Sequence, residues 1–115
     1  MDNLEEVSRP DGIIRHTLKT ANGLECEVSN YGCRILRLLV PDRDGEFEDI
    51  VLGFDSIDEY FQKPETFFGS IIGRVANRIK GATFTLNGKV HELPANDGEN
   101  HIHGGPEGYH SIVWN

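Results

Sequence analysis

Short runs of aliphatic and β-branched residues alternate with turn residues through the first part of the chain. The runs are Ile13 to Lys19, Leu24 to Ser29 and Cys33 to Val40, and the turns between them are Asn22-Gly23 and Asn30-Tyr31-Gly32. Runs of this length between such turns predict β-strands. Because Asn-Gly favours the positive φ of a tight reversal, we expect the first two runs to pair as an antiparallel hairpin.

The third run is followed by a second polar turn and a fourth predicted strand. Pro41 ends the run, since proline cannot donate a hydrogen bond to a strand ladder. The turn reads Asp-Arg-Asp-Gly at residues 42–45, and Phe47 to Leu52 then returns as a short strand. The first half of the chain therefore predicts four short strands in succession.

A further hairpin is predicted towards the end of the chain. Residues 82–93 read ATFTLNGKVHEL and alternate around Asn87-Gly88, the strongest short hairpin signal in the sequence. A two-residue turn would place Phe84 opposite His91. Under that register the apolar residues do not all share one face, so a four-residue loop is the alternative.

One short helix is predicted, at about Ile57 to Gln62. Residues Ser56 to Glu59, Ser-Ile-Asp-Glu, have the form of a capping box at its start, in which the Ser56 hydroxyl and the Glu59 carboxylate each accept a hydrogen bond from a free backbone N–H. Pro64 lies just beyond and cannot continue the helix. The pattern as a whole predicts a β-rich protein with a single short helix.

The length of the chain allows one small domain. With 115 residues it can bury one modest core, and a second independent core is not expected. Residues 1–12 are polar, lack a hydrophobic period and contain Pro10, so we expect a flexible lead-in there. Residues 13–115 are expected to belong to one domain.

Composition and charge narrow the choice of partners. A hydrophobic fraction of 37%, with 13 glycines and 5 prolines, is typical of a folded, turn-rich protein. A net charge of −8 repels phosphate backbones and anionic membrane surfaces, so we expect neither nucleic acid nor membrane as a partner. The acidic N-terminus lacks the basic and apolar stretches of a signal peptide. We therefore expect a cytoplasmic protein. Acidity in most proteins serves solubility, and it also suits a neutral ligand.

Cysteines and isolated histidines give little sign of chemistry. Cys26 and Cys33 are too few for a secreted disulfide scaffold of this size, and we expect both to be free thiols. His16, His91 and His110 have no sequence neighbours that suggest catalysis, and we expect them to be structural. The chain also contains no Gly-x-Ser-x-Gly elbow, Cys-x-x-Cys pair or His-Glu-x-x-His helix, which argues against common serine hydrolases, thiol oxidoreductases and zinc proteases.

Residues 67–80, FFGSIIGRVANRIK, mix apolar side chains with two glycines, two arginines and an asparagine. Glycine allows a ligand or another backbone to approach closely, and an arginine fork can hold a row of hydroxyl oxygens. Alternatively, Arg74 and Arg78 pair with some of the 19 carboxylates. The glycine spacing matches neither common nucleotide-binding loop, so phosphate binding is not expected.

Residues 96–105, NDGENHIHGG, place His101 and His103 on one face if the segment is extended. Such a pair can bind a metal, but a further ligand, for example Glu107 or His110, would have to converge from elsewhere. Solvated or core-satisfied histidines are one alternative, and catalytic or ligand-binding histidines are the other. The glycines beside them favour a turn that presents the second histidine toward a cavity.

Four segments resemble the aldose 1-epimerase, or galactose mutarotase, family. Two are the segments just described, at residues 67–80 and 96–105, and the others are NYGCRILRLLVPDRDGEFEDIVLGFDSIDEY at residues 30–60 and GATFTLNGKVHELPAND at residues 81–97. They follow the family's order and approximate spacing, and GRVANRI followed by NHIHGG is the most specific pair. The resemblance implies an all-β fold, a large antiparallel β-sandwich of the galactose mutarotase type that binds an aldohexose in an open polar cleft. It also implies interconversion of the α and β anomers of sugars such as galactose or glucose, with no metal and no organic cofactor.

The resemblance also assigns roles to individual residues. Asn77 and Arg78 of GRVANRI match the residues that hydrogen-bond sugar hydroxyls in the family, whereas Arg74 is expected to be structural. His103 matches the histidine that faces the sugar and assists catalysis. His101 is expected to be the less constrained neighbour.

Opening a hemiacetal ring takes a proton from the C1 hydroxyl and gives one to the ring oxygen, tasks that suit a carboxylate and an imidazole. Family members are much longer than this chain, and the resemblance places their main proton donor, a histidine, and their proton acceptor, a glutamate, beyond Asn115. We therefore expect the N-terminal third of an epimerase domain, which carries sugar-binding residues only and is inactive or nearly so by itself. Uncovered strand edges and apolar faces then predict self-association.

Two other functions compete with this interpretation. A non-catalytic carbohydrate-binding β-module would use the same polar residues only to hold sugar, and it would explain the length without truncation. A sugar-phosphate epimerase of the same superfamily would need additional basic residues around the cleft. A chain with a net charge of −8 gives no sign of them.

Overall fold

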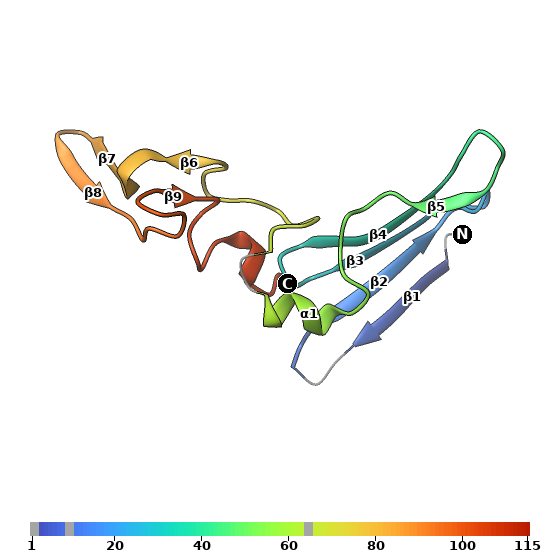
Figure 1. Ribbon diagram of the computed structural model, residues 1–115. Helices are drawn as coiled ribbons and strands as arrows, with labels where there is room; N and C mark the ends of the chain where they lie inside the picture. The colour runs from blue at the N-terminus through green and yellow to red at the C-terminus, as the bar shows by residue number, and fades with distance from the viewer. Residues whose placement is uncertain (1–2, 9–10, 64–65) are drawn as a thin grey trace.

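The computed structural model describes residues 3–8, 11–63 and 66–115, and its largest element is a five-stranded antiparallel sheet (Figure 1). The strands follow one another in chain order: β1 (Asn3–Ser8), β2 (Ile14–Lys19), β3 (Glu25–Ser29), β4 (Arg34–Pro41) and β5 (Phe47–Asp49). Each strand therefore pairs with its neighbours in the sequence, as short connections favour.

The expectation of a flexible lead-in over residues 1–12 is wrong for Asn3–Ser8. These residues form β1, which pairs with β2 from Asn3 opposite Lys19 to Ser8 opposite Ile14. Strand pairing satisfies backbone N–H and C=O groups whatever the side chains are, so a polar segment without a hydrophobic period can still complete the edge of a sheet. Residues 1–2 and 9–10 of that segment lie outside the described residues.

The hairpin predicted around Asn22-Gly23 is confirmed, because β2 and β3 pair antiparallel on either side of residues 20–24. β3 pairs in turn with β4, and the register shifts between Glu27 and Val28. This shift leaves Leu36 in a β-bulge, where its side chain packs against the core.

The predicted fourth strand is shorter than expected, because β5 ends at Asp49. The Asp49 side chain accepts hydrogen bonds from the backbone N–H of Leu38, at 2.9 Å, and of Val51, at 3.0 Å. A side-chain acceptor thus replaces the backbone acceptors of a longer ladder. β4, in contrast, runs one residue past its predicted end and includes Pro41.

The helix α1 (Ile57–Gln62) occupies the predicted residues. The Ser56 hydroxyl accepts from the N–H of Asp58 at 3.2 Å, and the Glu59 carboxylate accepts from the N–H of Ser56 at 3.4 Å, which confirms the capping box. The helix supplies two residues of the buried core, which consists of Ile13, Tyr31, Ile57 and Tyr60, with Leu36 and Phe54 packed against it.

The second half of the chain extends away from this sheet, and we call residues 73–108 the arm (Figure 1). Its regular elements are β6 (Arg78–Ile79), the 3₁₀ turn η1 (Lys80–Ala82), β7 (Thr83–Leu86), β8 (Lys89–Glu92) and β9 (His101–Ile102). β6 pairs with β9, and β7 pairs with β8, so the arm contains two separate two-stranded sheets.

The hairpin of β7 and β8 has the two-residue turn, Asn87-Gly88, that the sequence predicts. Phe84 lies opposite His91, and the two rings stack with their centres 5.0 Å apart. The four-residue loop is therefore wrong. Stacking across the strand pair compensates for apolar residues that do not share one face.

The end of the chain, including the 3₁₀ turn η2 (Tyr109–Ser111), returns to the sheet beside α1 (Figure 1). Tyr31 forms an isolated bridge with Val113, and the N–H of Gly32 donates to the carbonyl of residue 112 at 2.8 Å. A Cβ at Gly32 would lie 2.4 Å from the carbonyl oxygen of His110, so this close approach requires glycine. These contacts anchor the C-terminal end of the arm to the sheet. The molecule as a whole is elongated and measures 55 × 38 × 27 Å.

The predicted all-β class is confirmed by the antiparallel sheets and the single short α-helix. Cys26, which is half-buried, and Cys33, which is exposed, are both free thiols, as expected. In the part of the chain that the structure describes, no helix has the length and apolar character needed to cross a bilayer.

Candidate functional site

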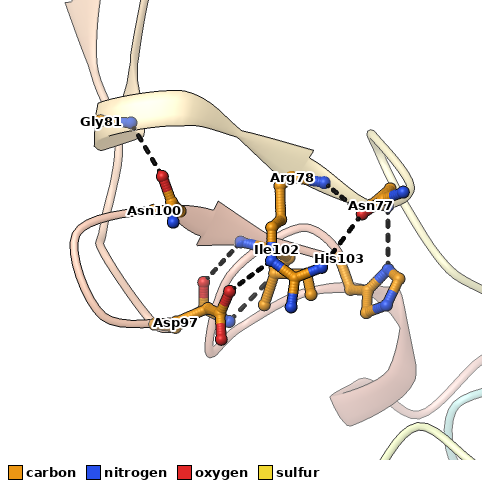
Figure 2. A network of polar contacts seen from close by, with 8 residues as sticks. Asn77, Arg78, Gly81, Asp97, Asn100, Ile102 and His103 are labelled. Atoms are coloured by element: carbon orange, nitrogen blue, oxygen red, sulfur yellow. Dashed lines mark hydrogen bonds and ion pairs between the residues drawn. The ribbon is translucent and has the colours of Figure 1, made fainter.

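Pairing of β6 with β9 brings together the two segments that the sequence singled out (Figure 2). Arg78 lies opposite Ile102 in this pair. Asn77 directly precedes β6 and His103 directly follows β9, so both lie at the same end of the pair. The structure therefore gathers all three residues to which the resemblance assigns contact with a sugar.

Asn77 and His103 hydrogen-bond to each other in both directions, and Figure 2 shows the bond to the His103 ring. The N–H of His103 donates to the carbonyl of Asn77 at 3.2 Å, and the N–H of Asn77 donates to Nδ1 of His103 at 3.0 Å. Nδ1 is thus an acceptor, so the neutral imidazole carries its proton on Nε2. This backbone contact sets both the orientation and the tautomer of the ring.

Both residues adopt a left-handed backbone, with φ of 62° at Asn77 and 52° at His103. Residues other than glycine rarely do so, and such conformations gather at functional sites where surrounding contacts hold them. The turn after His103 is held by close packing. A Cβ on Gly104 would lie 1.8 Å from the carbonyl oxygen of Gly73, so no larger residue fits there.

The guanidinium of Arg78 is held by two neighbouring side chains. Its Nε donates to Oδ2 of Asp97 at 2.5 Å, and the side chain of Asn77 accepts from Nη1 of Arg78 at 3.5 Å and from its backbone N–H at 2.9 Å. The Arg78 side chain is 55% exposed. Because arginine has five N–H donors, this arrangement orients the group and leaves donors available to a ligand.

Two asparagines that the sequence did not single out hold β9 in place. Asn96 accepts from the N–H of Ile102 at 2.8 Å and donates to its carbonyl at 3.1 Å. Asn100 accepts from the N–H of Gly81 at 3.1 Å. Strands of two residues offer few backbone partners, and these amides supply the missing ones.

His101 is held more firmly than expected. It is 5% exposed, and its Nδ1 lies 2.8 Å from the carbonyl oxygen of Pro94. A Cβ on Gly105 would lie 2.8 Å from the His101 ring. The expectation that His101 is the less constrained histidine is therefore wrong in terms of packing, because the pleat of β9 directs it into the arm.

The orientation of His103 toward a cavity stays a prediction. A cavity of about 450 Å³ in the arm is lined by His101 rather than by His103, together with Arg74 and Tyr109. Arg74, expected to be structural, places its guanidinium carbon 5.7 Å from the centre of the Tyr109 ring. His103 itself is half-buried and directly follows β9.

Phe67 packs between His103 and His110, a contact that the sequence does not indicate. The ring centres lie 4.8 Å apart for Phe67 and His103 and 4.6 Å apart for Phe67 and His110, both in edge-on geometry. Over the described residues, no three histidine, cysteine, aspartate or glutamate side chains are grouped as a metal site requires. Glu107 and His110 therefore do not complete a site with His101 and His103.

Comparison with known proteins identifies the family. The sequence profile of aldose 1-epimerases matches residues 15–115, which is most of the chain. This chain belongs to the aldose 1-epimerase family. It shares 46% identity over 103 residues with a galactose mutarotase from Bos taurus, which covers 90% of this chain and 30% of that protein. It shares 36% identity with an aldose 1-epimerase from Streptococcus thermophilus, again over 103 residues.

Solved structures of the aldose 1-epimerase family share the fold. A galactose 1-epimerase from Lactobacillus acidophilus matches with a TM-score of 0.79 and 33% identity, over 100% of this chain and 33% of that one. A GalM/aldose epimerase homologue from C. elegans matches with a TM-score of 0.77 and 34% identity. The chain thus spans about a third of the length of the relatives that it matches.

In this aldose 1-epimerase family member, the gathered side chains offer mainly hydrogen-bond donors. They are the guanidinium of Arg78, the Nε2–H of His103 and the side-chain amide of Asn77, whose oxygen already accepts from Arg78. Donors in such an arrangement suit the hydroxyl and ring oxygens of a neutral sugar. Asp97, which was not a predicted site residue, orients the arginine. The Asn96-Asp97 pair shortly before NHIHGG was the available signal.

Proposed function

We propose that this chain forms the sugar-holding part of an aldose 1-epimerase, and that Asn77, Arg78 and His103 bind an aldohexose such as galactose or glucose. The observation that carries the proposal is the reciprocal hydrogen bonding of Asn77 and His103, which places their polar groups beside the Arg78 guanidinium. Family membership supports the reaction type, interconversion of α and β anomers.

Ring opening of an aldose moves one proton away from the C1 hydroxyl and another onto the ring oxygen. His103 assists this chemistry by presenting Nε2–H as a donor, since Nδ1 is occupied by the N–H of Asn77. Arg78 and Asn77 hold hydroxyl groups, which restricts the sugar to one orientation and lowers the entropic part of the barrier. We infer that the main acid and base belong to the part of the family's domain that this chain does not cover, since it spans about a third of its relatives' length.

Sugar binding is tested by titrating the ¹⁵N-labelled chain with D-galactose and following backbone amide shifts. We expect saturable shifts at Asn77, Arg78 and His103. Arg78→Met should lower the apparent affinity for galactose at least tenfold. Arg43→Met serves as the control. It removes the same charge, but Arg43 lies on an exposed turn of the five-stranded sheet, away from the arm. Absence of saturable shifts, or equal weakening by both substitutions, would overturn the proposal.

Catalysis is tested separately, by polarimetry on freshly dissolved α-D-galactose. We expect the 115-residue chain to leave the rate of anomer interconversion at its buffer value, because it spans about a third of the length of its relatives and the resemblance assigns none of its residues as the principal proton donor or acceptor. Enzyme-like turnover would contradict this part of the proposal. A non-catalytic carbohydrate-binding module would give the same two results, and a coding sequence that continues past Asn115 to a histidine and a glutamate of the family pattern distinguishes the epimerase from it.

Cytoplasmic location and self-association through uncovered strands and apolar faces stay predictions. The first is tested by fractionation of cells that express the natural gene. The second is tested by sedimentation of the isolated chain over a range of concentrations.

A further inference from the structure

Arg34, the first residue of β4, is the most deeply buried charged side chain among the described residues, with 1% of it exposed. Nη1 donates to the carbonyls of Thr66, at 3.2 Å, and Phe68, at 2.8 Å. Nη2 donates to the carbonyl of His110 at 3.1 Å. One guanidinium therefore hydrogen-bonds two backbone segments that lie far apart in the sequence, and holds both at the start of β4.

One of these segments carries Phe67, whose ring packs against His103, and the other carries His110, whose ring packs against Phe67. The carbonyls of Thr66 and Phe68 flank Phe67 in the chain, so their hydrogen bonds to Arg34 limit rotation and displacement of Phe67. The ring of Phe67 in turn contacts those of His103 and His110. A continuous series of contacts thus leads from Arg34 through Phe67 to the imidazole.

Burial of a charged group at this position has a cost that a purely space-filling role would avoid. Burial lowers the pKa of Arg34, while its interactions with Tyr60 and Tyr31 act in the opposite direction. Its guanidinium carbon lies 4.4 Å from the centre of the Tyr60 ring, and its Nε has no hydrogen-bond partner among the described residues. An apolar side chain of similar volume would fill the space without desolvating a charge, so what arginine adds is its rigid set of donors.

We propose that Arg34 is a positioning residue for the site: by holding the backbone on both sides of Phe67 and the carbonyl of His110, it fixes the aromatic support against which the His103 imidazole packs. The inference rests on the proposed function for its relevance to sugar, because only then does the imidazole face a substrate. The positioning itself is a property of the free chain.

The test follows the ring protons of His103 by NMR in the full 115-residue chain. Arg34→Lys keeps the charge but loses the fork that spans two segments. We expect the His103 Hδ2 and Hε1 resonances to lose at least half of their displacement from unstructured-histidine values, because the Phe67 ring current no longer acts at a fixed distance. Arg37→Lys is the matched control, since Arg37 lies on the same strand but is 43% exposed and pairs with Glu25 and Glu27.

A merely structural role for Arg34 would lower the melting temperature and leave the His103 resonances in place, and that result overturns the proposal. Should Arg34→Lys fail to fold, Phe67→Leu decides instead, because it removes the ring and keeps the carbonyls that Arg34 binds. Loss of the His103 displacement in Phe67→Leu supports the proposal, and an unchanged His103 contradicts it.

Addition of D-galactose separates this inference from the proposed function. If sugar leaves the spectrum of the unsubstituted chain unchanged, the proposed function fails, yet the effect of Arg34→Lys on the free His103 ring still tests the positioning. If sugar binds, we expect Arg34→Lys to reduce the galactose-induced shift of His103 by at least half and Arg37→Lys to leave it as it is.

Discussion

The five-stranded sheet and the arm are built in different ways. In the sheet, neighbouring strands of up to eight residues pair along ladders of backbone hydrogen bonds, and a helix covers buried apolar side chains. In the arm, the strand pair that carries the site has two residues on each side, and side-chain amides and glycines at close contact complete it. The sheet thus depends on backbone pairing and burial, whereas the arm depends on particular residues, and the candidate site lies in the arm.

The largest effect is expected from a substitution in the core of the sheet, Tyr60→Ala. Tyr60 is 2% exposed, its hydroxyl accepts from the N–H of Phe54 at 3.0 Å, and its ring faces Arg34. Truncation of a buried aromatic residue costs about 3–5 kcal/mol, which is comparable with the whole stability of a small domain. We expect both regions to unfold, as measured by circular dichroism and amide dispersion.

The control for this substitution is Leu86→Ala in the arm, where the side chain is 56% exposed and the expected change is within about 0.5 kcal/mol. Survival of the arm's amide signals in Tyr60→Ala would contradict its dependence on the sheet. The contacts of residues 110–114 with the turn between β3 and β4 are the reason for that dependence.

A smaller and more local effect is expected for Gly104→Ala. The added Cβ would meet the carbonyl oxygen of Gly73 at 1.8 Å, and φ is 89°, so we expect a loss of about 1–3 kcal/mol concentrated at β6 and β9. Hydrogen exchange should accelerate at Ile102 and His103 and remain slow in β2 to β4. Gly88→Ala is the control, because its φ is also positive but no atom lies within 4 Å of the new Cβ.

Uniform acceleration across both regions in Gly104→Ala would show that the arm and the sheet unfold as one unit. Equal effects of Gly104→Ala and Gly88→Ala would show that backbone conformation, rather than packing, decides the cost.

A still smaller effect on stability, but a clear effect on binding, is expected for Asp97→Asn. The pair of Asp97 and Arg78 is partly exposed, and such pairs contribute about 0–1 kcal/mol. Loss of the carboxylate should nevertheless release the guanidinium and weaken galactose binding severalfold in an NMR titration. Glu99→Gln, at an exposed position of the same loop, should leave the affinity as it is. Indistinguishable affinities of the two variants for galactose would contradict the orienting role of Asp97.

The smallest effect concerns the two thiols. Cys33 is exposed and should react with iodoacetamide well before Cys26, whose thiol is half-buried and has its pKa raised by burial above the ordinary value of 9.0. A raised folded-state pKa disfavours the thiolate in the native chain. Cys26 therefore leaves stability unchanged below about pH 9 and lowers it as the pH rises from there toward the folded-state pKa.

Mass spectrometry of the alkylated chain measures the order of reaction, and urea unfolding of the native chain and of Cys26→Ser across that pH range measures the linkage. Faster labelling of Cys26 than of Cys33, or equal pH dependence in both chains, would contradict this interpretation of the sheet's interior.

Local signals predicted the fold where one short segment decides the structure. The capping box at Ser56 placed α1 to the residue, and Asn87-Gly88 placed a two-residue turn, because both depend on hydrogen bonds or φ angles within a few residues. β1 escaped prediction, since its pairing partner lies elsewhere in the chain and its side chains carry no period. The early end of β5 depends likewise on a contact between Asp49 and the neighbouring strand.

The candidate site was predictable only in part, for the same physical reason. Asn77, Arg78 and His103 came from the resemblance, and the structure gathers them at one end of β6 and β9. The supporting residues Phe67 and Arg34 were not predicted, because the sequence has no signal for the tertiary contact of Phe67 with His103 or for the burial of Arg34. An arginine in a strand is exposed in most proteins, and only the folded chain shows the carbonyls that it binds.

The most direct measurement of the central claim is a long-range ¹H–¹⁵N spectrum of the histidine side chains, recorded with and without D-galactose. At neutral pH we predict that His103 is the Nε2–H tautomer, as its hydrogen bond from Asn77 requires, and that galactose shifts its Nε2 saturably. His91, on the hairpin of β7 and β8, where its ring stacks on Phe84, should not respond. An Nδ1–H tautomer at His103, or no response to galactose there, would contradict the assignment of the sugar site to this end of the arm.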